Sequence, residues 1–177
     1  MKKLELSKKG KKNKGKYRAI VDDDIFDIVN EYSWSYHSNG YVSNTKTRML
    51  LHRFIWELKV GNIPDNKEIE HIDQNKLNCQ ISNLRLATHA ENMRNIGKRK
   101  NNKSGYNGIS KEIQKDKNRP GWKLEKWKAR IYIDGKTYCK RCDYTDEGLK
   151  EAIEWYKQKS LELQGEYSIY NRPDENK

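Results

Sequence analysis

The chain has 177 residues, with 37 Lys or Arg against 25 Asp or Glu, so that its formal net charge is +12. Hydrophobic residues make up 34%, below the roughly 45–50% of an average globular protein, which argues against one large core and favours one or two small domains. No apolar run reaches the ~20 residues that span a bilayer, the N-terminus lacks an apolar signal-peptide segment, and three Cys residues argue against a disulfide scaffold. We therefore expect a basic, intracellular protein that is not secreted.

The positive charge is concentrated in two short segments. Residues 1–18 hold nine Lys/Arg and one Glu, and residues 98–105 hold four Lys/Arg and no acidic residue. Such segments stay solvated, so we predict a basic disordered tail at 1–18 and a basic linker at 98–105. Contact with nucleic acid, with a ribosome or with a membrane surface would explain the excess charge, and so would solubility alone.

Residues 19–60 are predicted to form short strands and turns. The segments YSWSY and YVSNT flank the turn-forming sequence HSNG, a pattern that predicts a β-hairpin. Residues 48–58 fit either a strand or a helix that places Leu51, Ile55 and Leu58 on one face. The pattern leaves both alternatives open.

Residues 61–97 carry the densest polar chemistry of the chain. The sequence EIEHI at 68–72 is a strand candidate, and a polar loop follows it. Thr88 and Glu91 then have the T-x-x-E spacing of a capping box, which predicts the start of a helix. Asn92 falls in the first turn of this helix or just beyond it.

Residues 106–142 are predicted to form three strands. The segment KWKARIYI alternates along its length, with apolar residues on one face and mostly basic residues on the other: Trp127, Ala129, Ile131 and Ile133 against Lys126, Lys128, Arg130 and Tyr132. Asp134-Gly135 is a two-residue hairpin signal. If the loop has two residues, Arg141 of the next strand shares the basic face.

A helix is predicted after the strands, with Thr145 as its N-cap and Gly165 as its C-terminal stop. Residues 111–141 carry eleven Lys/Arg and four acidic residues, whereas residues 142–177 carry five and nine. This contrast is typical of a basic sheet that faces a polyanion, with the helix behind it.

The candidate site is the pair Glu70-His71 together with Asn92. Phosphodiester hydrolysis needs an activated water and a neutralised leaving oxygen. A neutral imidazole can take the proton of water near pH 7, and carboxylate and amide oxygens suit a hard cation such as Mg²⁺. Successive side chains of a strand point to opposite faces, so Glu70 and His71 can act together only where the strand twists or ends. The pair alone would equally fit a surface carboxylate beside a structural histidine.

The surrounding sequence resembles a known family. The segments LHR at 51–53 and IPDNKEIEHIDQNKLNCQISNLRLATHAENMRN at 63–95 resemble the HNH endonuclease family of phage and intron-associated homing enzymes. The matched positions are Leu51-His52-Arg53, His71, Asn75-Lys76, Ser82-Asn83-Leu84-Arg85, Thr88-His89 and Asn92. The resemblance covers most of residues 19–97. It implies an α+β fold in which a two-stranded hairpin and a helix surround one divalent metal, the ββα-metal arrangement.

The resemblance also implies residue roles. His71 would be the general base, and Asn92 would be a metal ligand. Glu70 would take the place of the usual Asp ligand of the family; its extra methylene could shift the metal and lower activity. Asn83 would brace the hairpin loop and help to orient His71. A Glu/Asn site would accept Mg²⁺ or Mn²⁺.

The remaining histidines and cysteines have simpler interpretations. His52 lies in an apolar stretch and is interpreted as a packed side chain, and His89 lies at the helix start, where the family often has His; a direct catalytic or phosphate role stays open for each. Cys139 and Cys142 form a single C-x-x-C without a second pair, so we expect no structural zinc.

The C-terminal residues 104–170 show a second resemblance. SGYNGISKE, WKARIYIDGKTY and a helix ending in QGEY are similar to the AP2-type DNA-binding domain, which lays a three-stranded sheet in the major groove. The positions that match its DNA-facing residues are Asn107, Ser110, Lys128, Arg130, Tyr132 and Cys139. Strand alternation adds Arg141 to this set.

Taken together, the two resemblances imply a homing-type, divalent-metal-dependent endonuclease that acts on double-stranded DNA. They imply a nuclease domain at 19–97 and an AP2-like domain at 106–172. They also imply a monomeric cytoplasmic protein that is encoded by a bacterial host cell or by a phage. The main alternative is a catalytically decayed HNH protein that acts as a sequence-directed DNA-binding regulator. A basic RNA-binding or ribosome-associated protein is a third possibility, but it gives the HNH residues no task.

Overall fold

We analysed a computed structural model that describes residues 1–6, 15–95 and 102–171. It combines helices with antiparallel strands, which confirms the predicted α+β class. The chain divides into two compact units, Met1–Met93 (unit 1) and Arg94–Lys177 (unit 2), each of which is described by itself. None of the helices in the described ranges has the length and apolar character needed to cross a membrane.

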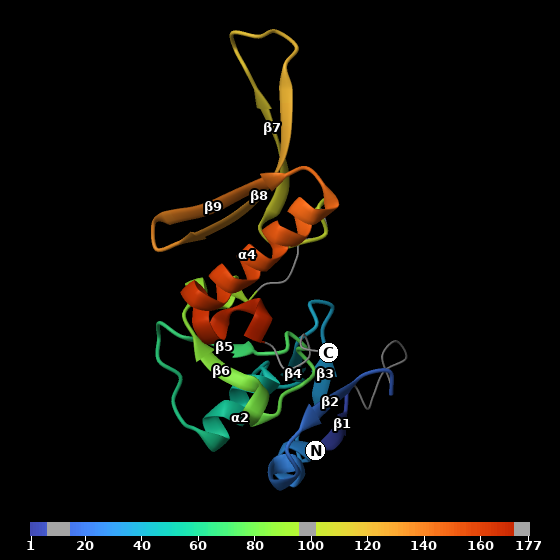
Figure 1. The fold of residues 1–177 in the computed structure, drawn as a ribbon. Coiled ribbons are helices and arrows are strands. Elements are labelled where there is room, and N and C mark those ends of the chain that lie inside the picture. The colour runs from blue at the N-terminus through green and yellow to red at the C-terminus, as the bar shows by residue number, and fades with distance from the viewer. Residues whose placement is uncertain (7–14, 96–101, 172–177) are drawn as a thin grey trace. The chain divides into compact units, whose positions relative to one another are not determined.

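Unit 1 is built from pairs of antiparallel strands and short helices (Figure 1). The strand pairs are β1 (Lys2–Glu5) with β2 (Arg18–Val21), β3 (Trp34–Tyr36) with β4 (Val42–Asn44), and β5 (Glu68–His71) with β6 (Leu84–Ala87). The helices are α1 (Phe26–Asn30), α2 (Leu51–Lys59) and α3 (His89–Arg94), the last of which reaches the boundary with unit 2. Short 3₁₀ turns lie at Asp23–Ile25 and Ile81–Asn83.

The sequence predicted some of the strands and helices of unit 1 but not all of them. The β3–β4 hairpin is confirmed, and the open choice at residues 48–58 is resolved as helix α2, which buries Leu51 and Ile55 on one face. The prediction of strands and turns alone over residues 19–30 was wrong, because α1 follows β2. Acidic residues at Asp23, Asp24 and Asp27 lie near the start of this helical segment, where the helix dipole favours negative charge.

The predicted disordered tail was wrong at its start. Residues Lys2–Glu5 form strand β1, which pairs with β2 in the register Leu4↔Ala19. Leu4 and Leu6 are fully buried in the core of unit 1, so the hydrophobic alternation of KKLEL outweighs its charge. Residues 7–14 of the predicted tail lie outside the described residues, as do residues 98–101 of the predicted linker.

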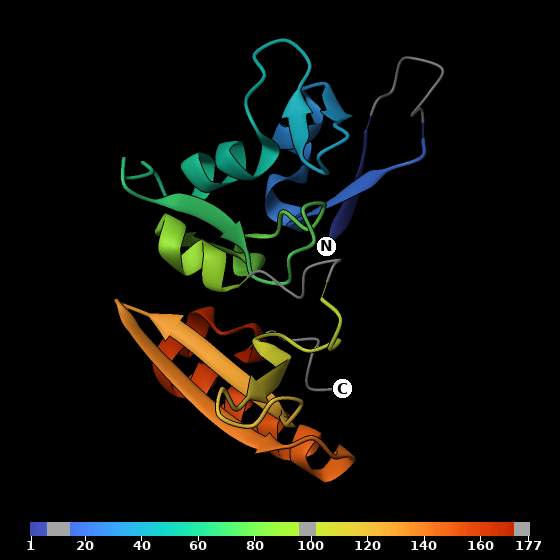
Figure 2. The same ribbon diagram turned by 90° about the horizontal axis from the view of Figure 1, so that it is seen from above.

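Unit 2 is a three-stranded antiparallel sheet covered on one face by a helix. The strand order is β7 (Ile109–Lys115), β8 (Lys123–Ile133) and β9 (Lys136–Asp143), and helix α4 spans Asp146–Gln164. Figure 2 shows α4, in red, behind β8 and β9, in orange. Short 3₁₀ turns at Gly165–Tyr167 and Ile169–Asn171 follow the helix.

The β8–β9 turn fixes the strand register of unit 2, and an N-cap fixes the start of α4. Asp134 and Gly135 have φ values of 49° and 78°, as the predicted two-residue loop requires, and Ile133 pairs with Lys136. The Thr145 hydroxyl accepts a hydrogen bond from the Gly148 amide and caps α4, as predicted. The apolar face of β8 packs on α4 through Ala129, which is fully buried.

We predict that Leu6→Ala destabilises unit 1 by about 2–5 kcal/mol, the usual effect of removing buried methylene groups. The measurement is chemical denaturation followed by circular dichroism. Leu58→Ala is the matched control, because Leu58 is an exposed leucine of α2, and it should change the free energy of unfolding by less than ~0.5 kcal/mol. An equally small effect of Leu6→Ala would show that Leu6, which directly follows β1, is not part of the core.

Candidate functional site

Strand β5 divides its side chains between two faces. Because side chains alternate along a strand, Glu68 and Glu70 share one face, while Ile69 and His71 share the other. Glu70 and His71 are both buried, each with 5% of its surface exposed. The strand ends at His71, so the two predicted catalytic positions lie at the end of β5.

Glu70 is a buried carboxylate of which only one oxygen has a hydrogen-bond partner in the described residues. Its Oε2 accepts a hydrogen bond from Arg85 Nε at 2.8 Å, and the two residues face each other across the β5–β6 pair. Within the part of the chain that the structure describes, its buried Oε1 has no hydrogen-bond partner. A buried polar atom without a partner is destabilising. A cation bound at Oε1 would remove that penalty.

Helix α3 contacts the first residue of β5, Glu68, through two side chains. Asn92 Nδ2 donates to Glu68 Oε2 at 2.8 Å, and His89 Nδ1 lies 3.2 Å from Glu68 Oε1. The hydrogen bonds from Asn92 and then His89 lower the pKa of Glu68. The structure thus pairs Asn92 with Glu68, whereas the sequence predicted that it would meet Glu70 at a metal.

Sequence reasoning overlooked Glu68 and the partner of Glu70. The period of two in the segment EIE could have placed Glu68 on the same face of the strand as Glu70. Arg85 was noted as part of the family motif, but its pairing with Glu70 depends on the register between β5 and β6. That register is not visible in local sequence.

His71 lies on the opposite face of β5 among aromatic and sulfur groups. Its ring meets the ring of His52 edge-on at 5.0 Å between centroids, and its Nε2 lies 3.9 Å from Cys79 Sγ. Burial lowers the pKa of His71 to about 4 and that of His52 to about 3. Both imidazoles are therefore neutral at pH 7, and His52 is a packed side chain, as the sequence indicated.

Lys76 and Tyr41 lie near the two imidazoles on this face of β5. Lys76 Nζ lies 4.0 Å from the centroid of the Tyr41 ring and donates to the backbone oxygen of Asn39 at 2.9 Å. The Tyr41 ring is in turn 5.4 Å from His52 and 6.2 Å from His71. The turn between β3 and β4 therefore buttresses the loop that follows His71.

Asn83 holds the loop between β5 and β6. Its Oδ1 accepts from the Asp73 amide at 3.1 Å, and its Nδ2 donates to Asp73 Oδ1 at 2.9 Å and to the Asn78 backbone oxygen at 2.8 Å. Its own backbone oxygen accepts from the Ile72 amide, next to His71. These bonds fix the loop from both ends. Whether they orient His71 in catalysis stays a prediction.

The start of α3 is fixed by the predicted capping box. The Glu91 carboxylate accepts from the Thr88 amide at 2.7 Å, and the Thr88 hydroxyl accepts from the Glu91 amide at 3.2 Å. The hydrogen bonds from Thr88, together with Lys67, lower the pKa of Glu91 to about 2. The predicted capping box is confirmed. It fixes the residue at which α3 begins and therefore the position of Asn92 along the helix.

The donor atoms on the α3 side suit a hard cation. The described ranges contain no group of three or more His, Cys, Asp or Glu that could hold a metal ion. A site built on Glu70 Oε1 and an Asn92 amide oxygen would therefore be open, with its other positions left to water and phosphate, as Mg²⁺ prefers. The unpartnered oxygen of Glu70 fits such an ion.

Unit 2 gathers the predicted DNA-facing residues on the sheet face away from α4, which we call the outer face. Lys128 and Arg141 are cross-strand partners, so Arg141 shares the face of Lys128, as predicted for a two-residue loop. Both donate to the Glu112 carboxylate at 2.6 Å, and the hydrogen bonds from Arg141 and then Lys128 lower the pKa of Glu112 to about 2. Glu112 was not predicted as part of this face.

The other predicted residues extend the outer face. Gly108, Ile109, Ser110, Lys128 and Arg130 line a shallow hollow of about 300 Å³. Tyr132 is 64% exposed near the β8–β9 turn, Cys139 is the cross-strand partner of Arg130, and Asn107 precedes β7. The outer face therefore combines cations, hydroxyl groups and an aromatic ring.

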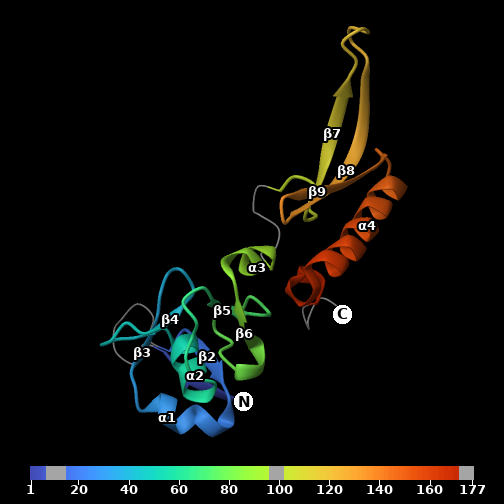
Figure 3. The same cartoon turned by 90° about the vertical axis from the view of Figure 1, so that its left-hand side faces the viewer.

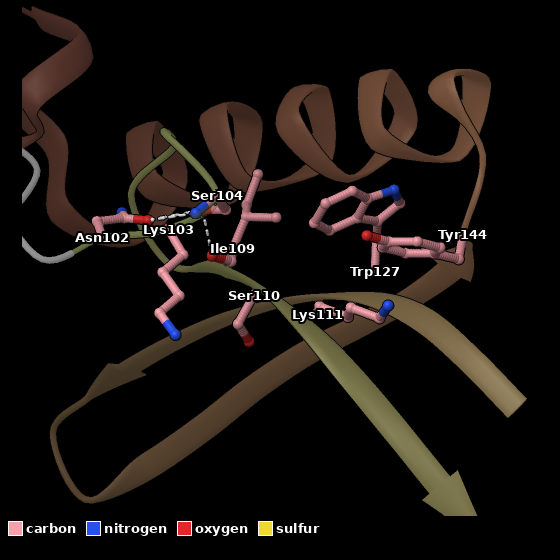
Figure 4. Close-up of a pocket in the computed structure, with 8 residues that line it drawn as sticks. All are labelled: Asn102, Lys103, Ser104, Ile109, Ser110, Lys111, Trp127 and Tyr144. Atoms are coloured by element: carbon pink, nitrogen blue, oxygen red, sulfur yellow. Dashed lines mark hydrogen bonds between the residues drawn. The ribbon is translucent and has the colours of Figure 1, made fainter. Parts of the chain in front are cut away.

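A larger cavity of about 460 Å³ lies beside the first residues of β7 and is lined by residues that include Ser104, Ile109, Ser110, Trp127 and Tyr144. Figure 4 shows the rings of Trp127 and Tyr144 side by side beneath α4, whereas Ser110 points away from the helix. The two rings are 4.6 Å apart, and Ser104 Oγ donates to the Ile109 backbone oxygen at 2.6 Å to close one end. Trp127 and Ser110 therefore point to opposite sides of the sheet.

Comparisons with known proteins identify the class of this chain. The family model described as HNH endonuclease matches residues 49–94, which include β5, β6 and α3. An uncharacterized HNH endonuclease, L560 of Acanthamoeba polyphaga mimivirus, is 35% identical over 158 residues, which cover 88% of this chain and 75% of that protein. Protein 3.8 of Escherichia phage T7 is 32% identical over 121 residues, or 67% of this chain and 88% of that protein. No solved structure matches the chain.

The chain belongs to the HNH endonuclease family. The family match contains every residue that the sequence placed in the candidate site: Glu70, His71, Asn83 and Asn92. The match ends at residue 94, where unit 2 begins, so it does not extend to residues 104–170, which resemble the AP2-type domain.

We predict that unit 1 loses stability as the pH falls from about 6.5 to about 5. The pKa values of His71 and His52 in the folded chain are about 4 and about 3, below the ordinary 6.5, so the unfolded chain binds protons first in this range. Each pH unit in which the unfolded chain holds one extra proton removes about 1.4 kcal/mol of stability.

Urea denaturation as a function of pH measures this loss. His52→Gln should flatten the slope between pH 6.5 and pH 5, because one of the two groups is gone. Carboxylates such as Glu91, with a pKa of about 2, lose their contribution only below about pH 4.5 and do not affect this window. A free energy of unfolding that stays constant across the window would contradict the neutral, buried state of the two imidazoles.

Proposed function

We propose that this HNH protein is a homing-type, divalent-metal-dependent endonuclease that hydrolyses phosphodiester bonds in double-stranded DNA. Family membership supports nuclease chemistry. The observation that carries the metal dependence is the buried Glu70 Oε1, a carboxylate oxygen without a hydrogen-bond partner in the described residues, one position before His71. Glu70 and Asn92 would hold Mg²⁺ or Mn²⁺.

In this proposal His71 is the general base. Its burial keeps the imidazole neutral at pH 7, so a ring nitrogen can accept the proton of the attacking water. The oxygen of this water forms a bond to phosphorus, and the bond from phosphorus to the 3′-oxygen breaks. The bound divalent ion would neutralise the charge that develops on the leaving oxygen.

Other residues of unit 1 act through position. Arg85 holds one oxygen of Glu70 and thereby directs the other oxygen. Asn83 braces the loop that begins at His71, and the cap formed by Thr88 and Glu91 fixes the start of α3. Together they restrict the side chains that would meet the metal and the water.

Unit 2 would hold the duplex, as an AP2-like domain does. The proposed DNA-binding residues are Ser110, Lys128, Arg130, Tyr132 and Arg141 of the outer face, together with Asn107, which precedes β7. A β-sheet ribbon fits the width of the major groove, and the cations would contact phosphates or guanine edges. In this assignment residues 19–97 form the nuclease domain and residues 106–172 the DNA-binding domain.

A plasmid assay tests the proposed function. The protein is incubated with supercoiled DNA libraries that contain candidate targets, with Mg²⁺, with Mn²⁺ or with EDTA. We expect metal-dependent nicking or linearisation that His71→Ala reduces at least ~100-fold, the usual contribution of a general base. His37→Ala is the matched control, because His37 lies in the β3–β4 turn and contacts Ser43 instead. Binding without cleavage in every metal, with a cognate target present, would refute the nuclease.

The Glu70→Asp variant tests the metal ligand. Asp is the residue that the family usually has here, so we expect Mn²⁺ binding to persist in calorimetric titrations and cleavage to be equal or faster. Glu70→Gln should weaken Mn²⁺ binding at least ~10-fold, since it removes the charge of the hard ligand. Unchanged Mn²⁺ affinity in Glu70→Gln would exclude Glu70 as a ligand.

One observation favours a second candidate function. The ion pair of Glu70 with Arg85 already neutralises the carboxylate, as expected for a decayed nuclease that acts as a DNA-binding regulator. This candidate predicts sequence-directed binding to DNA with no effect of Mn²⁺ on the thermal stability of unit 1. The nuclease predicts that Mn²⁺ stabilises the native chain but not the Glu70→Gln variant.

A further inference from the structure

Strands β7 and β8 continue beyond the three-stranded sheet as a two-stranded ribbon. The last pair between β8 and β9 is Lys126↔Asp143, whereas β7 and β8 stay paired as far as Lys115↔Lys123. We call residues 113–125 the arm. Figures 1 and 3 both show the arm leaving the sheet away from α4, toward the side of the outer face.

The arm exposes apolar side chains that the described part of the chain does not cover. Ile113 is 49% exposed, Trp122 40% and Leu124 37%. A two-stranded hairpin without a packed face is marginally stable in water, and neighbouring exposed apolar groups often mark a contact surface. These exposed side chains make the arm a candidate contact surface for another molecule.

The charge of the arm identifies the chemistry of that partner. Residues 113–125 hold four Lys/Arg and two acidic residues, Asp116 and Glu125, and Glu125 is paired with Lys111 at 2.6 Å. Asp116 is itself paired with Arg119 at 3.6 Å. Cations that alternate with an exposed tryptophan are typical of surfaces that contact the phosphates and the sugar or base faces of nucleic acid.

We infer that the arm is a second DNA contact, separate from the outer face. A duplex held on Lys128 and Arg130 would have the arm along one flank. Lys117 and Lys123 would then reach phosphates of its backbone, and Trp122 would pack on the sugars beside them. This inference rests on the proposed role of the outer face in DNA binding, and it adds an element to which neither resemblance assigned a role.

The salt dependence of DNA binding tests the arm. Full-length protein in EDTA is titrated against a labelled mixed-sequence duplex by fluorescence anisotropy at several NaCl concentrations. Lys117→Gln/Lys123→Gln should lower the affinity several-fold and flatten the slope of log K against log salt by about 2, since each lost phosphate contact removes about 0.9. The matched control, Lys150→Gln/Lys157→Gln, removes the same charge from α4 and should leave the slope near its native value.

Trp122 gives a second, uncharged readout. Trp122→Ala should weaken binding several-fold without a change in the salt slope, and Trp122→Phe should restore most of the affinity, because stacking needs an aromatic ring. These residues are exposed in unit 2, so the variants should unfold at the native temperature. Equal affinities for the native chain and Trp122→Ala would overturn the packing contact.

A third variant, Lys128→Gln/Arg130→Gln, separates failure of this inference from failure of the proposed function. If it flattens the slope while the arm variant does not, the arm inference is wrong and the outer face stands. If neither variant changes the slope, both DNA assignments of unit 2 are wrong. If the arm variants instead dissociate a dimer in sedimentation velocity, the arm binds a second copy of the chain and the inference is overturned.

Discussion

Two adjacent ionisable side chains, Glu70 and His71, are buried at the end of β5. The need to compensate for their loss of contact with water is the constraint on which unit 1 depends. Burial raises the free energy of any charge that has no partner. Glu70 is paired with Arg85 across the strand pair, while His71 gives up its charge among His52, Cys79 and Tyr41. The alternation of β5 separates these two environments. In the proposed mechanism Glu70 would bind the cation and His71 would accept the proton.

The rest of unit 1 limits the motion of these groups. Asn83 ties the loop after His71 to its two ends, and the Thr88 cap fixes the helix that carries Asn92. Unit 2 applies the same principle to a different partner: Glu112 holds Lys128 and Arg141 in place on the outer face. Side chains that are already held in place would lose less conformational entropy on binding a ligand.

Sequence patterns predicted the elements whose signals are local. The capping box at Thr88, the Asp134-Gly135 loop and the two faces of β8 each depend on spacings of a few residues. The prediction of a disordered tail was wrong at residues 2–5 because it was based on the many lysines. The alternation of Leu4 and Leu6 stabilises a strand only when β2 pairs with β1. The pairing of Asn92 with Glu68 joins residues 24 positions apart. Such a contact depends on how α3 packs on β5, and no local pattern encodes it.

Anomalous diffraction from crystals of the protein with Mn²⁺ and a bound duplex tests the central claim most directly, because it locates the metal without reference to activity. The account predicts a single anomalous peak in unit 1, about 2 Å from Glu70 Oε1 and from the Asn92 amide oxygen, with a phosphate of the duplex beside it. A peak on Glu68 and His89 instead, or cleavage-competent crystals with no metal at Glu70, would contradict it.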